Sequence, residues 1–227
     1  MLSAYLDEGG RLLALVDPMM DTGLDGLLSK WGIELGHDIV VDPARQLPFL
    51  SAANVFVTTY TQHPIVERMQ TFMTLFPLAR SASPTKPPRA CISATALAMT
   101  SEQGWGETRM QAKPFQFTRG EDTPGPVSIA VASERAGPIP SRVVAVGDSD
   151  FVADVQLSNA GNEDFAMGAL HWLVDQPQLI GIGPKSLESI KLSLSGRQMT
   201  GIFWLNFAAV PSVFMFLGLG MWLLRRR

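Results

Sequence analysis

The segment Gly147-Asp148-Ser149-Asp150 has the residue types that a binding or catalytic site would need. It follows an apolar, β-branched run at residues 142–146, which predicts a buried strand. α/β proteins place ligands at the carboxyl ends of their strands, and two carboxylates there could coordinate Mg²⁺. The same residues also form ordinary strand-to-loop turns, because Asp and Ser accept hydrogen bonds from local amides. No phosphate-binding glycine loop or second acidic cluster accompanies them, so a turn is the favoured interpretation.

Ser149 also lies in a partial match to the Gly-x-Ser-x-Gly turn of α/β hydrolases, but Phe151 occupies the place of the second glycine. A triad of Ser149, His171 and an aspartate is disfavoured, because His171 precedes Trp172 in an apolar helical stretch typical of packed histidines. An amidotransferase needs Cys, His and Glu acting together, and Cys91 has no glycine-rich turn around it. We therefore predict that the chain is not an enzyme.

Metal and cofactor sites are not indicated by the remaining reactive residues. His37, His63 and His171 are far apart in sequence and lack ligand spacing. Cys91 is the single cysteine, which excludes an internal disulfide, and its small apolar neighbours predict a packed strand residue. Asp17-Pro18 follows another predicted strand, where a turn is favoured over a ligand loop. The net charge of −3 gives no broad basic surface, so nucleic acid is not expected as a partner.

Residues 101–125 are rich in glycine, proline and charge, and they predict an exposed excursion from the core. Trp105, Phe115 and Phe117 lie among its polar residues. Aromatic side chains on exposed loops are costly unless they are covered, so this segment either contacts a partner or packs on its own domain. Both alternatives remain open, as they do for the pair His63-Pro64. The candidate ligand or partner residues are thus Asp148, Ser149, Asp150 and Trp105.

The elements that position these residues follow from apolar runs of strand and helix length. The predicted strands cover residues 11–16, 39–41, 54–59, 91–100, 127–133 and 142–146, and the predicted helices cover 24–31 and 162–175. Pro64 is suited to the first position of a further helical turn. Short apolar strands alternating with helices predict an α/β domain over residues 1–183, with a largely parallel sheet sandwiched by helices.

The C-terminus has the pattern of a membrane anchor. Residues 184–200 predict an amphipathic linker, and residues 201–224 carry no charge, which predicts a transmembrane helix of the required roughly 20 residues. Trp204 and Trp222 lie near the two ends of this stretch, where interfacial aromatics are favoured. The arginines at 225–227 predict a basic anchor on the cytoplasmic side. These features predict a single-pass protein of the bacterial inner membrane, with its domain in the periplasm.

Five stretches in the same order resemble the ABC-transporter auxiliary family, the group that includes the gliding-motility auxiliary component. They are residues 5–18, with Gly9-Gly10 and Asp17-Pro18; His63-Pro64-Ile65; residues 97–101 with Trp105 and Glu107; residues 147–151 with Gly161-Asn162 and His171-Trp172-Leu173; and the terminal uncharged stretch with its arginines. The resemblance covers essentially the whole chain. It implies a domain similar to class-I glutamine amidotransferases but without catalytic residues.

The resemblance also implies a function and partners. We expect a non-enzymatic auxiliary subunit of an ABC-type export system, without cofactor, whose terminal helix packs on the permease. The chain has no Walker loop, so ATP hydrolysis is expected in a separate subunit, and membrane lipid is expected around the helix. Family members begin with a further membrane helix and strands, so we expect that the native product is longer than the one starting at Met1 or is made with a separate N-terminal partner. The alternative is a membrane-anchored hydrolase or ligand-binding domain that uses the loop at residues 147–150.

Overall fold

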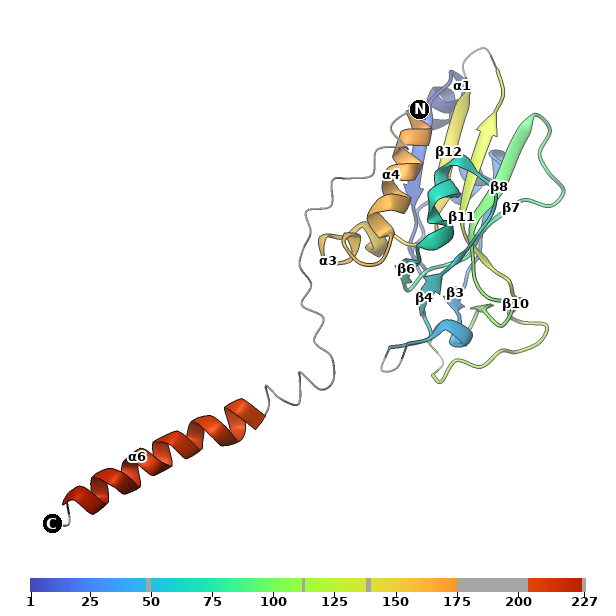
Figure 1. Ribbon diagram of the computed structural model, residues 1–227. Helices are drawn as coiled ribbons and strands as arrows, with labels where there is room; N and C mark the ends of the chain where they lie inside the picture. The colour runs from blue at the N-terminus through green and yellow to red at the C-terminus, as the bar shows by residue number, and fades with distance from the viewer. Residues whose placement is uncertain (48–49, 112, 138–139, 175–203, 226–227) are drawn as a thin grey trace. The chain divides into compact units, whose positions relative to one another are not determined.

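The computed structural model describes residues 1–47, 50–111, 113–137, 140–174 and 204–225 (Figure 1). The chain divides into two compact units, Met1–Pro184 and Lys185–Arg227. The predicted linker at residues 184–200 lies outside the described residues. The predicted boundaries of the linker and the domain therefore stay predictions.

A five-stranded sheet forms the centre of the first unit. Its strands are β1 (Arg11–Leu15), β12 (Ser141–Val146), β11 (Ser128–Arg135), β8 (Ile92–Met99) and β5 (Thr59–Tyr60), in that spatial order. Only β1 and β12 are parallel, and every other neighbouring pair is antiparallel. The predicted largely parallel sheet is therefore wrong. The physical reason is visible between β11 and β12, since a parallel crossover needs a dozen or more residues and the connection between them is far shorter.

Three small antiparallel sheets surround the central one. They pair β2 (Ile33–Leu35) with β7 (Ala82–Pro84), β4 (Asn54–Val57) with β6 (Thr74–Pro77), and β9 (Trp105–Glu107) with both β3 (Ile39–Val41) and β10 (Thr123–Pro124). The fold is thus mixed and rich in sheet, which corrects the amidotransferase-like α/β sandwich implied by the resemblance. The predicted strands and helices themselves mostly exist, and the error lies in how the strands pair.

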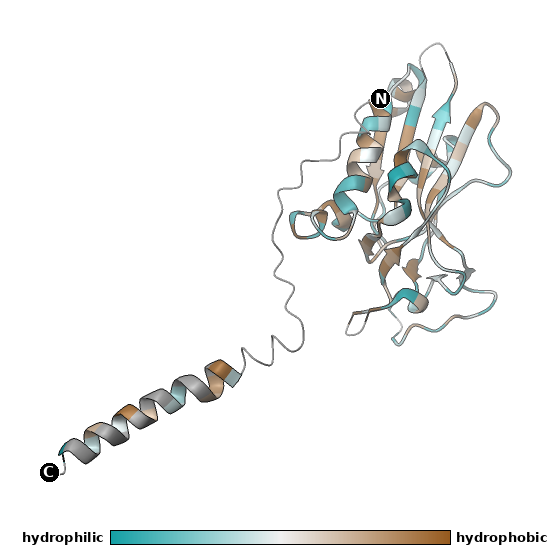
Figure 2. Cartoon of the chain, viewed as in Figure 1, coloured by the Kyte–Doolittle hydropathy of each residue, from teal (hydrophilic) through white to brown (hydrophobic). Residues whose placement is uncertain are grey.

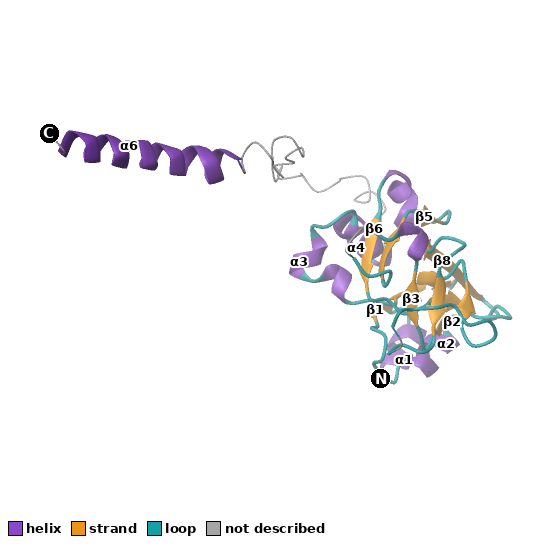
Figure 3. Cartoon of the chain, turned by 90° about the horizontal axis from the view of Figure 1, so that it is seen from below, coloured by secondary structure: helices purple, strands orange, loops and turns teal. Residues whose placement is uncertain are grey.

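Helices flank the central sheet on both of its faces. Among the described residues of this unit the longest helix is α4 (Asn162–Leu173), and the 3₁₀ helix η2 (Pro64–Thr71) packs with it over one face. The other face carries α1 (Leu2–Asp7) and α2 (Asp25–Lys30). Figure 3 shows α3 (Asp154–Leu157) and α4 on one side of the strands and α1 and α2 on another. Two short 3₁₀ helices, η1 (Pro43–Arg45) and η3 (Asp150–Val152), complete the unit.

Both faces of the sheet are covered by apolar packing, which accounts for the apolar residues that dominate its inner strands. Figure 2 colours each residue of these strands by its hydropathy. Val144 and Val146 of β12 pack toward α4, whereas Val143 packs toward α1 and α2. The rings of Phe76, Phe151 and Phe165 meet edge-on or tilted in the first of these cores, with centroids 5.2 to 5.9 Å apart. The sheet is therefore packed on both of its faces.

The described part of the second unit is a π-helical turn, η5 (Leu205–Ala209), followed by α6 (Val210–Arg225). α6 has 16 residues, fewer than the roughly 20 that a bilayer requires. Among the residues that the structure describes, no helix is long and apolar enough to cross a membrane. This finding corrects the predicted transmembrane helix at residues 201–224 and the single-pass inner-membrane localisation that rested on it. Pro211, which has no backbone N–H to donate, lies next to the junction between the π-helical turn and α6.

Candidate functional site

The parallel pairing of β1 with β12 places the loops after these two strands side by side. The strands are in register from Arg11 opposite Arg142, and Val16 extends the ladder by donating to the carbonyl of Val146 at 2.9 Å. Asp17 then meets Ser149, which donates its N–H to Oδ1 at 2.5 Å and its hydroxyl to Oδ2 at 2.7 Å. The loop at residues 147–150 therefore has a partner in Asp17, which the sequence pattern indicated only as part of a turn after its own strand. The one sequence signal for this contact was the acidic residue that lies two positions after each of the strands β1 and β12.

Asp148 is fully buried beneath this loop, with an exposed fraction of 0%. Its Oδ1 accepts a hydrogen bond from the N–H of Asp150 at 2.8 Å, whereas Oδ2 has no hydrogen-bond partner among the described residues. The pKa of Asp148 is raised to about 7, chiefly by burial; the hydrogen bond from the Asp150 amide opposes this rise, and the carboxylates of Asp150 and Asp17 add to it. The buried carboxyl group therefore takes up its proton near neutral pH.

Arg80 holds the base of the loop. Its backbone N–H donates to the carbonyl of Gly147 at 2.7 Å, and a Cβ atom at Gly147 would lie only 1.9 Å from the Arg80 carbonyl oxygen. The Arg80 guanidinium, 2% exposed, donates to the carbonyls of Gly36 at 2.8 Å and Met20 at 3.4 Å. The loop after β1 is therefore fixed from below by Arg80 and laterally by Ser149.

This arrangement does not assemble a catalytic triad. The Ser149 hydroxyl already donates to Asp17, and no hydrogen bond in the described structure joins Ser149 to His171. His171 lies in the last turn of α4, whose final carbonyls accept from Arg11 and Arg142 at the starts of β1 and β12. Ser149 follows the other ends of those strands. At roughly 3.3 Å per residue, a whole strand length separates the two side chains.

Mg²⁺ coordination was the less favoured interpretation of the loop at residues 147–150. Within the described ranges, no group of three or more His, Cys, Asp or Glu side chains is placed to hold a metal ion. Cys91 is exposed and precedes β8 in a left-handed conformation with φ of 60°, so it is not the packed strand cysteine that we expected. A tight turn enters β8 here, which the small neighbouring residues did not indicate.

Trp105 lies on β9, in a small sheet separate from the central sheet whose strand β12 precedes the loop at residues 147–150. It is 9% exposed and packs in a small core with Ile39, Val41 and Ala53, while its indole N–H donates to Glu107 at 3.2 Å. The structure thus packs Trp105 on its own domain. Phe117, with its ring centroid 6.2 Å from that of Trp105, is the aromatic of this excursion that stays 46% exposed.

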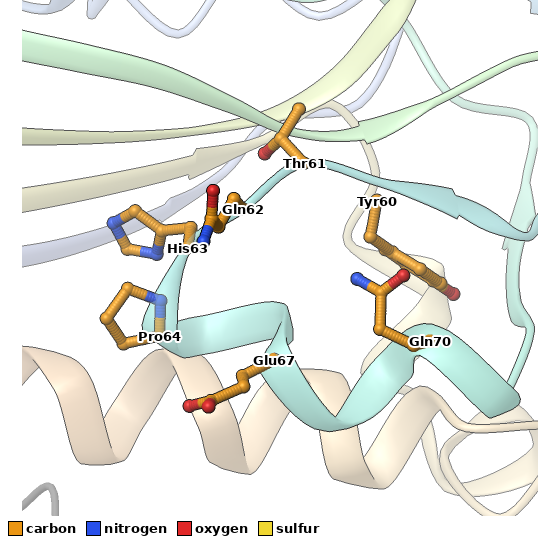
Figure 4. Close-up of a pocket in the computed structure, with 7 residues that line it drawn as sticks. All are labelled: Tyr60, Thr61, Gln62, His63, Pro64, Glu67 and Gln70. Carbon is orange, nitrogen blue, oxygen red and sulfur yellow. The ribbon is translucent and has the colours of Figure 1, made fainter.

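A groove of about 590 Å³ lies between the end of β5 and η2 (Figure 4). The residues that line it are Tyr60, Thr61, Gln62, His63, Pro64, Glu67 and Gln70. The sequence indicated His63-Pro64 but not the groove, because Glu67 and Gln70 reach the groove only when η2 forms its helical turns. Pro64 is the first residue of that helix, as predicted.

Two residues of this groove are held in their neutral forms. His63 caps η2 by accepting the N–H of Ile65 on Nδ1 at 3.2 Å, and its ring meets Trp172 edge-on at 5.1 Å. Burial lowers the pKa of His63 to about 4, so its imidazole is uncharged at pH 7. Burial also raises the pKa of Tyr60 to about 12, and its hydroxyl bonds to Thr74 at 2.8 Å. Glu67 is therefore the charged group among the lining residues.

Comparison with known proteins gives a fold relative and a family. No curated protein matches the chain significantly. The solved mmIFT52 N-terminal domain has a TM-score of 0.57 and 20% sequence identity, covering 76% of this chain and 68% of that chain, which shows similarity of fold alone. The family described as an ABC-type uncharacterized transport system matches residues 1–169, and the chain therefore belongs to that family.

Proposed function

We propose that this chain is a non-enzymatic auxiliary subunit of an ABC-type export system, which binds the permease while a separate subunit hydrolyses ATP. The family match over residues 1–169 supports association with ABC-type transport. The chain has no Walker loop to bind nucleotide phosphates, which supports a separate ATPase. In this proposal residues 1–183 are the binding module, and residues 184–200 link it to the terminal segment.

The observation that carries the proposal is an exposed apolar loop on a rigid base. Met19 and Met20 are each 59% exposed, although the loop that bears them is fixed by Asp17, which accepts both hydrogen bonds of Ser149. Ordered apolar side chains facing water favour a protein contact, and methionine adapts its shape to a partner surface. Asp150 is exposed on the neighbouring loop and adds a polar margin. We call Met19, Met20, Ser149 and Asp150 the sheet-end surface.

The sheet-end surface is proposed as the contact with the permease. A photo-cross-linking amino acid at position 20, in the full chain co-expressed with its permease and ATPase, should form a covalent adduct with the permease. The matched control is position 167, another exposed methionine, which lies on α4 and should give no adduct. Adducts from position 167 but not from position 20 would move the contact to α4. The absence of both adducts, with all subunits present, would contradict the proposal.

A further inference from the structure

The outer edge of β8 is covered along only part of its length. β5 pairs with its last residues, Tyr60 opposite Ala98, and Thr61 adds a bond from its N–H to the carbonyl of Leu97 at 3.2 Å. The chain then turns at His63 into η2 and leaves the sheet. Among the described residues, no strand pairs with the first half of β8 on this side. The central sheet therefore ends in an open edge.

The backbone of Ala94 points out of that open edge. The hydroxyl of Thr61, on the outer side, donates to the carbonyl of Ala96, so Ala96 directs its carbonyl outward. The register between β8 and β11 shifts at Leu97, so the carbonyls of Leu97 and Ala96 both face Thr61, but the pairing is regular from Ala96 to Ile92. Within this regular stretch residues two apart direct their backbone groups to the same side, which gives Ala94 an outward N–H and C=O. Thr95 lies between them and faces β11, where it stands opposite Ala132. Among the described residues, no backbone group bonds to Ala94 on this side, so its N–H and C=O offer a donor and an acceptor on the strand edge.

This edge also lacks the features that usually block pairing. Natural edge strands are guarded by charged residues or proline. The open half of β8 reads Ile92-Ser93-Ala94-Thr95-Ala96, with no charge, no proline and mostly small side chains. A further strand could approach it without a steric or electrostatic penalty.

The groove at η2 adjoins the open edge through Thr61, which lines the groove and bonds to β8. Glu67 contributes a carboxylate to this groove, and it forms no ion pair with any described residue. Gln62 and Gln70 contribute amides, and His63 is neutral. The groove therefore offers one net negative charge beside hydrogen-bonding groups, which complements a cationic side chain.

We propose that the outer edge of β8 receives an extended segment of a partner protein as an added strand, and that a lysine or arginine of this segment docks beside Glu67. In such strand addition, main-chain hydrogen bonds supply affinity, and a neighbouring pocket selects the side chain. This inference concerns a surface other than the sheet-end surface, and it stands whether or not the permease contact is correct.

The test uses the full chain and a defined probe, the acetylated and amidated peptide Thr-Val-Lys-Val-Thr-Val with a fluorescein label, titrated by fluorescence anisotropy. Two matched peptides replace its lysine with glutamate, or methylate alternate backbone nitrogens. We expect the lysine peptide to bind saturably, and both replacements to weaken binding by about tenfold or more, since each removes charge-assisted or main-chain hydrogen bonds. No binding of the lysine peptide, or equal binding of the methylated one, would overturn the proposal.

Variants of the chain locate the binding. Ala94→Pro removes the outward N–H and should abolish binding, whereas Ala94→Ser keeps that N–H and should bind normally. Glu67→Gln should weaken binding of the lysine peptide to the level of the glutamate peptide. Glu163→Gln, which alters an exposed residue of α4, should leave binding unchanged. Circular dichroism checks that each variant is folded. If Ala94→Pro unfolds, the methylated peptide on the unaltered chain still decides; unchanged binding in folded Ala94→Pro would contradict the proposal.

Discussion

Burial favours the neutral forms of Asp148 and His63, and the two groups make stability depend on pH in opposite senses. The pKa of Asp148 is raised to about 7 in the folded state, so the folded chain binds this proton more tightly than the unfolded chain. Its contribution is fully present below the ordinary carboxyl pKa near 4 and is lost as the pH rises through 7. His63 has its pKa lowered to about 4, so its contribution is present above about pH 6.5 and is lost as the pH falls.

Asp148→Asn should remove one of these two dependences, because an amide is neutral at every pH. We expect the difference in unfolding free energy between this variant and the natural chain to grow between about pH 4 and pH 7, by at most about 1.4 kcal/mol per pH unit. Urea denaturation at pH 5 and pH 8 measures it, with the variant gaining relative stability at pH 8. Asp150→Asn, an exposed neighbour, is the control that should show a much smaller change. If the difference in unfolding free energy between the two chains did not change with pH, the raised pKa of the buried Asp148 carboxyl would be contradicted.

His63→Asn tests the opposite sign. Asparagine keeps an oxygen acceptor for the N–H of Ile65, so the cap of η2 survives while the titrating group is removed. We expect the natural chain to lose stability relative to the variant as the pH falls from about 6.5 to 4. Urea denaturation across this pH range measures the effect. If the stability of the natural chain relative to the variant fell toward alkaline pH instead, the predicted direction would be wrong.

Ser149 should act as a structural link and not as a nucleophile. Ser149→Ala removes the hydroxyl bond to Asp17 but keeps the backbone bond, so we expect a loss of about 1 to 3 kcal/mol in unfolding free energy. The purified chain should show no ATPase, esterase or amidase turnover. A turnover that disappears in folded Ser149→Ala would instead support the hydrolase alternative.

At the scale of elements, carboxylate and serine pairs link segments that are distant in sequence. Asp38 accepts from the N–H and hydroxyl of Ser81, both at 2.8 Å, and Asp42 accepts the same two groups of Ser101 at 2.8 and 2.7 Å. The pair of Asp17 with Ser149 repeats this arrangement at the sheet end. These pairs satisfy partly or fully buried carboxylates and fix the loops that connect the small sheets to the central one.

The contact between Arg80 and the end of β12 should be intolerant of any added atom. Gly147→Ala would place Cβ 1.9 Å from the Arg80 carbonyl oxygen, which is backbone and cannot yield, so we expect destabilisation of about 3 kcal/mol or more. Gly26→Ala in α2 is the matched control, because a Cβ there meets nothing within 4 Å. Helix propensity predicts that it stabilises the chain by up to about 1 kcal/mol. Thermal unfolding of both variants compares them, and equal effects would refute the contact.

At the scale of the whole molecule, stability should fall from the centre of the five-stranded sheet toward its edges. β11 and β12 have partners on both sides and apolar packing on both faces, so their amides should exchange with deuterium most slowly. Ala94 and Thr95 are a matched pair within β8: both lie opposite residues of β11, but backbone alternation directs only the N–H of Thr95 toward that strand. We expect the Ala94 amide to exchange markedly faster, measured by NMR, and similar protection of both would show that the edge is covered.

Local sequence patterns determined where most elements of this chain lie. Apolar runs located β1, β11 and β12, helical spacing located α2 and α4, and Pro64 located the start of η2, because these signals depend only on near neighbours. The same patterns placed Asp148 and Ser149 in a loop just after a buried strand. The ordered motifs were also sufficient to indicate the transport family that the comparison confirmed.

The tertiary structure alone decided how these elements pair and what the site residues touch. Strand direction, the partnership of Ser149 with Asp17, the burial of Asp148 and the packing of Trp105 all join residues far apart in sequence, where no local pattern can register them. The uncharged C-terminal stretch showed the same limit, since apolarity predicted a span while the described α-helix begins only at Val210. Apolarity is a property of each residue, whereas helix length and strand pairing depend on backbone hydrogen bonds that only the folded chain defines.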